Sequence, residues 1–177
     1  TDSLLNKRFE AFEISYQLQN DSLQYWIKKN EAIQNYQVIQ DNLQENEGMA
    51  TFYLNEDQLF GLLILKDHVL IRKQDSVTEA INQFYRSIKT ARNDWKEAGT
   101  RLDTLLFGSW NKEMSGLDHL VIIPDGELNQ IPFEALFNPV NKRLLVEEMA
   151  VSYHYSVWLW QQGRFDHKAF GEMNWCG

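Results

Sequence analysis

The side chains from which a protein most readily builds a nucleophile and its base are few in this chain: one cysteine and four histidines. A cysteine thiolate can attack a carbonyl carbon while a histidine imidazole accepts and returns the proton. The cysteine is Cys176, the penultimate residue, and chain ends usually fray. The best-placed histidine is His154, which follows a predicted strand, yet no sequence feature fixes the end of the chain beside it. We therefore predict that the chain holds no catalytic residue.

The other three histidines are in positions that do not favour catalysis. His68 opens a predicted strand and is expected to be exposed, and His167 lies in the C-terminal tail. His119 stands at the front end of a buried strand, whereas sites in open α/β sheets lie at the carboxyl ends of strands. No two histidines or cysteines have the spacing of metal ligands, about two to five residues, so no metal site is predicted.

Three carboxylates near the middle of the chain could do acid–base work: Asp125, Glu127 and Glu134. Asp125 and Gly126 form the strongest turn signal in the sequence, because aspartate bonds its own backbone and glycine accepts a positive φ angle. The turn accounts for an aspartate at position 125, and solvent exposure accounts for a glutamate at position 127. We therefore interpret these carboxylates as structural. The glycine-rich pattern of phosphate-binding loops is absent, and no cofactor is predicted.

These carboxylates lie in residues 117–139, the stretch around which the rest of the chain is organised. It contains the run LVII over 120–123, which is short, rich in β-branched residues and typical of a buried strand. Pro124 ends that strand because proline cannot donate to a β-ladder. After the turn, Pro132 can begin a helical turn that points Phe133 inward. We predict that Phe133 anchors the core.

This stretch resembles the start of the CHAT domain, a caspase-like domain of bacterial proteins that usually follows tetratricopeptide repeats. The family carries a strand, then P-D-G-x-L, then P-F-x-A-L, and both motifs are complete here. Their residues form a structural signature: Pro124, Asp125, Gly126, Leu128, Pro132, Phe133, Ala135 and Leu136. The similarity continues through residues 145–148 and 151–156 and begins upstream near Leu43. It covers most of the chain but only the N-terminal portion of the family's domain.

The resemblance implies a caspase-like fold and, for the family, peptide cleavage by a histidine–cysteine dyad. The family's histidine precedes a glycine at the end of a later strand, and its cysteine follows small residues at the end of the next. Neither motif occurs in this chain. We therefore expect the α/β class, as an incomplete caspase-like α/β sheet with an antiparallel meander, preceded by a helical segment.

Two parts are predicted: a helical, repeat-like segment over 1–47 and the N-terminal part of a CHAT-like domain over 48–177. Apolar residues at helical spacing, such as Leu5 and Phe9, indicate helices in the first part. Gly48 is expected to end it. These helices are either a last, degenerate repeat that receives a partner or a lid that packs on its own domain.

An antiparallel meander is predicted next, with strands over 49–54, 59–65 and 68–73 and short turns between them. The middle strand is apolar on both faces, so it should be covered on both sides. Gly61, inside that strand, marks a close backbone approach or a bulge.

Two helices are predicted after the meander, over 77–91 and 95–107. A capping box over 76–79 opens the first, and Gly108 ends the second. Residues 111–116 are predicted to form an exposed loop. Two helices between two strands imply a crossover connection, and such crossovers favour one parallel pairing with right-handed sense.

The last predicted strand covers 149–153. Ser156 can cap a short helix, and Gly163 is expected to end it. The aromatic cluster over 157–160 is interpreted as core rather than as a ligand site. An irregular tail is expected over 164–177.

The bulk properties exclude several classes of partner. The chain has 177 residues and a net charge of −8, whereas a nucleic-acid surface needs clustered lysine and arginine. No apolar run approaches the ~20 residues of a membrane-spanning helix, and the first ten residues lack the apolar region of a signal peptide. A cytoplasmic protein is therefore expected, with neither nucleic acid nor membrane as a partner.

Three functions fit these observations. The first is a non-catalytic portion of a CHAT-like protein that acts as a scaffold and protein-interaction region, with the remainder of the CHAT domain or another protein as its partner. The second is a fragment of an active cysteine endopeptidase whose histidine–cysteine dyad lies beyond this chain. The third is a free-standing module that binds a partner through its helical N-terminal segment.

Overall fold

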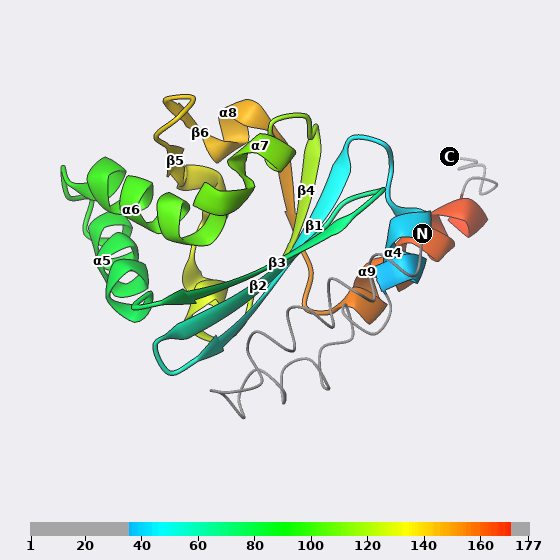
Figure 1. The fold of residues 1–177 in the computed structure, drawn as a ribbon, viewed down its shortest axis with the longest axis horizontal. Coiled ribbons are helices and arrows are strands. Elements are labelled where there is room, and N and C mark those ends of the chain that lie inside the picture. Colours follow the sequence, from blue (N-terminus) through cyan, green and yellow to red (C-terminus); the bar gives the residue numbers. More distant parts are fainter. Residues whose placement is uncertain (1–35, 171–177) are drawn as a thin grey trace, which may run out of the picture.

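The computed structural model describes residues 36–170, and for 164–170 it gives the course of the helix alone. The helices predicted within residues 1–35 lie outside this range. Figure 1 shows a twisted sheet in the middle of the molecule with helices on both of its faces. The predicted fold class, an incomplete caspase-like α/β sheet with an antiparallel meander behind a helical segment, is confirmed.

The main sheet has five strands in the order β3-β2-β1-β4-β7. Its meander consists of β1 (Glu47–Asn55), β2 (Gln58–Ile64) and β3 (Val69–Asp75), which pair antiparallel. Two further strands pair in parallel, β4 (His119–Ile123) against β1 and β7 (Ala150–Tyr153) against β4. The parallel pairing expected from the crossover is thus confirmed, and β7 is an edge strand of the described sheet.

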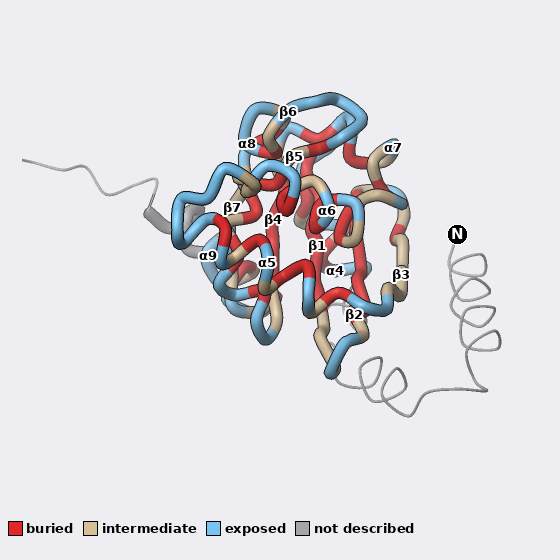
Figure 2. The backbone as a smooth tube through the Cα atoms, turned by 90° about the vertical axis from the view of Figure 1, so that its left-hand side faces the viewer, coloured by how far each residue is buried: buried red, intermediate tan, exposed pale blue. Residues whose placement is uncertain are grey.

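Helices cover the sheet from two sides. On one face lie α5 (Thr78–Lys89) and α6 (Trp95–Phe107), and α4 (Tyr36–Asn42) and α9 (Val157–Phe170) lie on the other (Figure 1). The bounds of α6 agree with the predicted helix over 95–107. Figure 2 shows that β1 and β4 are buried between these layers, while the outer turns of the helices are exposed.

The alternation of side chains along β2 divides the core into two clusters. Leu59 and Leu63 belong to the cluster under α5 and α6, whereas Phe60, Leu62 and Ile64 belong to the cluster under α4 and α9. All five side chains are fully buried. Successive residues of a strand face opposite sides, so an apolar strand of this kind requires cover on both. The predicted cover on both faces of the middle strand is confirmed.

The connection from β4 to β7 is built from short elements. In chain order they are the 3₁₀ turns η2 (Gly126–Gln130) and η3 (Phe133–Ala135), the hairpin β5 (Phe137–Asn138) and β6 (Arg143–Leu144), and α8 (Leu145–Glu148). This connection carries most of the CHAT signature, and it packs against the α5–α6 face of the sheet.

Two predicted irregular segments are helical. Residues 111–116 were expected to form an exposed loop, but η1 (Gly108–Trp110) and α7 (Asn111–Met114) occupy this region, because Trp110 and Met114 are buried in the core. Gly163 was expected to end the last helix, yet α9 continues to Phe170. A glycine inside a helix costs only about 1 kcal/mol, which the packing of the first turn of α9 can offset.

The sequence predicted that Gly48 ends a helical region, and this prediction is wrong. Helix α4 ends at Asn42, and Gly48 is the second residue of β1. A Cβ atom at this position would lie 2.8 Å from Leu117 Cδ1 and 3.1 Å from Leu65 Cδ2. Glycine is therefore needed here for close side-chain packing within the sheet and not for a helix cap.

The capping box predicted over 76–79 is not formed. Val77 is the N-cap residue of α5 and makes no side-chain capping bond, while Ser76 has a φ angle of 60°. The first free amide is satisfied from the β1–β2 turn instead, because the Asp57 carboxylate accepts a hydrogen bond of 2.8 Å from the Thr78 N–H. This bond lowers the pKa of Asp57 below its ordinary value.

Gly61 marks a close approach and not a bulge. The pairing of β2 is continuous through it, with Phe52 on one side and Arg72 on the other. The Trp110 ring lies against its backbone, so that a Cβ atom on Gly61 would be 2.8 Å from Trp110 Cη2. The same ring stacks under the Arg72 guanidinium, 5.5 Å from its centre.

Gly61→Ala is expected to lower the free energy of unfolding by about 2 kcal/mol, because Trp110 is buried and an added methyl group overpacks the core. Denaturant titration measures this change. Gly116→Ala is the control, since no heavy atom lies within 4 Å of a Cβ atom there. Equal stability of the two variants would contradict the role given to Gly61.

Candidate functional site

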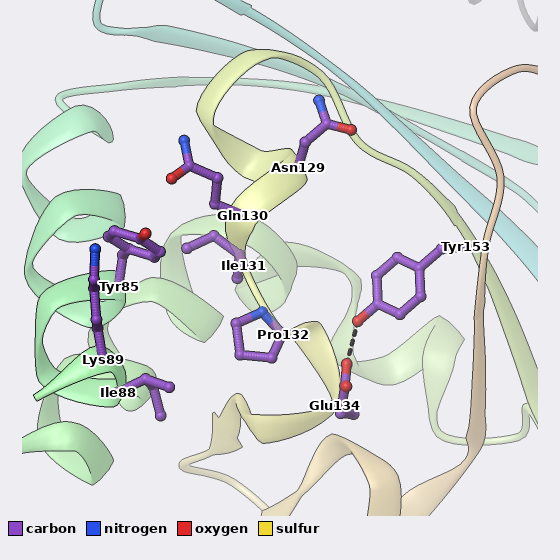
Figure 3. Close-up of a pocket in the computed structure, with 9 residues that line it drawn as sticks. All are labelled: Tyr85, Ile88, Lys89, Asn129, Gln130, Ile131, Pro132, Glu134 and Tyr153. Atoms are coloured by element: carbon purple, nitrogen blue, oxygen red, sulfur yellow. Dashed lines mark hydrogen bonds between the residues drawn. The ribbon is translucent and has the colours of Figure 1, made fainter. Parts of the chain in front are cut away.

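An open cavity of about 430 Å³ lies beside the last residue of β7 and the connection that leaves β4. Figure 3 shows its two walls, with α5 on one side and Tyr153 on the other. The lining residues are Tyr85, Ile88, Lys89, Asn129, Gln130, Ile131, Pro132, Glu134 and Tyr153. Ligands of open α/β sheets bind outside the carboxyl ends of parallel strands, which is the position of this cavity. We refer to it as the β7 cavity.

The turn after β4 leads into residues 129–132, which line the cavity. Gly126 has a φ angle of 54°, which glycine adopts without a steric penalty. The sequence predicted that the Asp125 carboxylate would bond its own backbone. Instead it accepts a 2.9 Å hydrogen bond from the Leu54 N–H of β1. The turn is thereby tied to the neighbouring strand, and residues 129–132 are held at the edge of the cavity.

Phe133 lies beneath the cavity in the core. Its side chain is fully buried, and its ring centre lies 5.8 Å from that of Phe52, 6.2 Å from that of Phe107 and 6.1 Å from that of Tyr153. Its main-chain N–H also donates a 2.9 Å hydrogen bond to the Tyr153 hydroxyl oxygen. Phe133 therefore packs against β1, α6 and β7 beneath the cavity, as its predicted role as anchor requires.

Tyr153 and Glu134 form the polar part of the cavity (Figure 3). The Tyr153 hydroxyl donates to the Glu134 carboxylate while it accepts from the Phe133 N–H. Burial, followed by the hydrogen bond to Glu134, raises the pKa of Tyr153 above its ordinary value. The hydroxyl therefore stays protonated at neutral pH and holds the Glu134 carboxylate at the wall of the cavity.

The opposite wall supplies one cation and an apolar surface. The Lys89 ammonium lies 5.4 Å from the centre of the Tyr85 ring, a cation–π distance. Ile88 from the same helix is 36% exposed. With the amides of Asn129 and Gln130, these groups suit a polar chain segment that presents a hydrophobic side chain. The cavity has no histidine or cysteine in its lining.

The signature residues take positions that explain their types. Leu128, Phe133 and Leu136 are fully buried, and Ala135 packs against them. The remaining four shape the chain: Pro124 follows β4, Asp125 and Gly126 form the turn, and Pro132 precedes η3.

The three carboxylates considered from the sequence are not brought together as an acid–base pair. Asp125 is bonded to Leu54, Glu134 to Tyr153, and Glu127 is exposed. Their different partners support the structural interpretation of these residues.

Three of the four histidines lie in or beside different elements of the fold. His68 is half-buried and its Nδ1 lies 2.6 Å from Asp67 Oδ1 in a turn. His154 extends β7, since its main-chain N–H donates to Ile122 O at 3.0 Å. The side chains of His167 and Cys176 lie outside the described residues, and with them the pairing of His154 and Cys176.

His119, whose position at the front end of a strand did not favour catalysis in the sequence, has polar partners on both ring nitrogens. Its Nδ1 lies 2.9 Å from Glu47 Oε1, and its Nε2 lies 2.8 Å from Ser152 Oγ. The three residues come from three neighbouring strands and are far apart in sequence. A prediction that β1, β4 and β7 pair in parallel would have placed Glu47 beside His119, but the register was not available from the sequence.

Within residues 36–163, no group of three histidine, cysteine, aspartate or glutamate side chains is arranged to hold a metal ion. Among the described helices, none combines the length and the apolar character that crossing a membrane requires.

Residues 96–169 match the family model of the CHAT domain. The matched region begins in α6, contains the whole signature and ends in α9, so it is shorter than the similarity predicted from Leu43. No curated protein matches the chain.

Proposed function

We propose, from the premise that this chain carries part of a CHAT domain over residues 96–169, that the chain is a scaffold on which the rest of such a domain assembles. In this proposal the chain supplies the meander side of the sheet and the β7 cavity, and its partner is the remainder of the domain. The histidine–cysteine chemistry of the family would come from that partner. The observation that carries the proposal is that β7 pairs with β4 on one side and with no described strand on the other, which we call the open edge of β7.

The main-chain groups of β7 alternate in direction. The N–H groups of Ala150 and His154 donate to Asp118 O and Ile122 O across β4, at 2.9 and 3.0 Å. Since hydrogen-bonding groups of a parallel strand alternate, those of Val151 and Tyr153 point away from β4, toward the edge. Among the described residues no strand pairs with this side of β7. Parallel strands are usually interior, so a further strand fits here.

Large apolar side chains gather in the segment that follows this edge. Tyr153, Tyr155, Trp158 and Leu159 are 43%, 89%, 58% and 44% exposed. Exposed apolar groups clustered in this way are typical of a surface that another part of a protein covers. The predicted core role of the aromatic cluster therefore holds for Trp160, which is buried, and not for Trp158.

Val151→Pro is expected to abolish association with a polypeptide that carries the remaining strands of a CHAT domain, while this chain stays folded. Proline removes the outward N–H of Val151, and edge strands tolerate proline where that N–H faces outward. Isothermal titration measures the loss of binding, and hydrogen exchange of the Tyr153 amide, protected only on pairing, reports the location. Val151→Ala is the control, because it keeps the N–H. Unchanged binding by the proline variant would refute the proposal.

A second function is favoured by the place of the β7 cavity. The assembled domain would be a cysteine endopeptidase whose substrate side chain enters this cavity, at the carboxyl ends of β4 and β7. Peptide cleavage by the assembled protein, absent from either part alone, tests it.

Binding of a partner by the helical segment is tested by deleting residues 1–35. Residues 36–47 must stay, because Ile39 and Leu43 belong to the core.

A further inference from the structure

We propose that Glu47, His119 and Ser152 form a second site, in which Ser152 is a base-activated hydroxyl that accepts an acyl group from an activated ester. The site lies on the face of the sheet that carries α4 and α9, at the amino ends of β1 and β4, whereas the β7 cavity lies on the α5 side at the carboxyl ends of β4 and β7. It goes beyond the scaffold function and does not depend on it.

The register of the parallel strands creates this cluster. Glu47 of β1 lies opposite His119 of β4, and Ser152 of β7 lies two residues beyond Ala150, the partner of His119. Residues two apart on a strand share a face, so all three side chains project from the same face of the sheet. This is the face that carries α4 and α9, because Met49 and Val121, two residues further along β1 and β4, belong to the apolar cluster there.

The Glu47 carboxylate is held in place on both of its oxygens. Its Oε1 lies 2.9 Å from His119 Nδ1, and its Oε2 accepts a hydrogen bond of 3.1 Å from the Gln44 N–H. The residue is 2% exposed. A carboxylate without solvent around it keeps few alternative positions, so it fixes the orientation of the imidazole ring.

These contacts determine the direction of the hydrogen bonds. A carboxylate only accepts, so the proton of the neutral imidazole lies on Nδ1, between His119 and Glu47. The lone pair of Nε2 then faces Ser152 Oγ at 2.8 Å and accepts the hydroxyl proton. Acid, imidazole and serine hydroxyl in this order form the arrangement by which proteins activate a serine.

A reagent can reach the serine. Ser152 is partly exposed on the edge strand, and the His119 side chain is 36% exposed. In the reaction, Ser152 Oγ attacks the carbonyl carbon of the ester while its proton passes to His119 Nε2. The carbon–oxygen bond to the leaving group then breaks, and the leaving group departs with that proton. The product is an O-acylated Ser152 with His119 neutral again.

Labelling by p-nitrophenyl acetate, with the acetylated positions read by mass spectrometry, tests the proposal. In the wild-type chain we expect Ser152 to be acetylated at least about tenfold faster than exposed Ser115, whose hydroxyl donates only to the Lys112 carbonyl oxygen. Ser152→Ala should remove this fast labelling. His119→Gln should reduce the rate at Ser152 to that at Ser115, and circular dichroism checks that the variant is folded.

Two results would overturn the proposal. One is equal acetylation of Ser152 and Ser115 in the wild-type chain, a comparison that needs no variant. The other is fast labelling of Ser152 in folded His119→Gln protein, which would leave the Glu47–His119 pair with only a structural role. Neither result bears on the open edge of β7, because Val151→Pro tests that edge through association.

Discussion

Replacing Phe133 by alanine is expected to lower the free energy of unfolding by about 4 kcal/mol. The side chain is fully buried and contacts the rings of Phe52, Phe107 and Tyr153. The loss combines the transfer free energy of the ring with the cost of the cavity that remains. Chemical denaturation, with the midpoint and the slope both fitted, measures the change.

The control for this experiment is Tyr155→Ala. Tyr155 is also aromatic and lies near the end of β7, but it is 89% exposed. Its replacement should change stability by no more than about 0.5 kcal/mol. If both variants lost the same small amount, Phe133 would not be the anchor of the connection between β4 and β7.

Asp103→Asn is expected to stabilise the protein at pH 8 and to have little effect at pH 4. Asp103 lies in α6, is 1% exposed, and its Oδ2 has no hydrogen-bond partner within the described part of the chain. Burial, followed by repulsion from Glu148, raises the pKa of this carboxyl from 3.8 to about 7. Asparagine has a similar shape and carries no charge, so it avoids the penalty of burying a carboxylate.

The sign of the pH dependence follows from proton binding. Between pH 4 and pH 7 the folded protein keeps the proton on Asp103 while the unfolded chain releases it, so the free energy of unfolding falls as pH rises. Above about pH 7 both states are ionised and the loss is complete, at roughly 4 kcal/mol or less. Below pH 4 both states are protonated and no difference remains.

Thermal unfolding of both proteins from pH 4 to pH 8 measures this effect. The gain from Asp103→Asn should grow through the window and reach at least about 2 kcal/mol at pH 8. Asp41→Asn, at an exposed position in α4, should give no such trend. A gain that is the same at every pH would show that the charge of Asp103 is not the cause.

The elements with strong local patterns were predictable from the sequence. The apolar run of β4, the alternation of the meander and the helical period of α6 each depend on neighbours within a few residues, and the structure has all three. The turn at Gly126 belongs to the same class, since its positive φ angle is a property of one residue.

Features that depend on distant partners could not be predicted. Gly48 was assigned from a local rule, whereas its type is explained by Leu117, which reaches it from another element. For Gly61 the sequence left a close approach and a bulge open, and Trp110, also from another element, makes it a close approach. The contact between Glu47 and His119 joins residues 72 apart, and the one between His119 and Ser152 joins residues 33 apart. The register of the parallel strands brings these side chains together, and the strands themselves lie far apart in the sequence.

The hydrogen bond from Thr78 to Asp57 has a consequence for the order of folding. The two residues are 21 positions apart, and β2 and β3 lie between them. The first turn of α5 therefore gains this acceptor only after the chain has closed the hairpins that bring the β1–β2 turn back to it. Since starting a helix is the costly step, the nucleation of α5 is coupled to a sheet that has already formed.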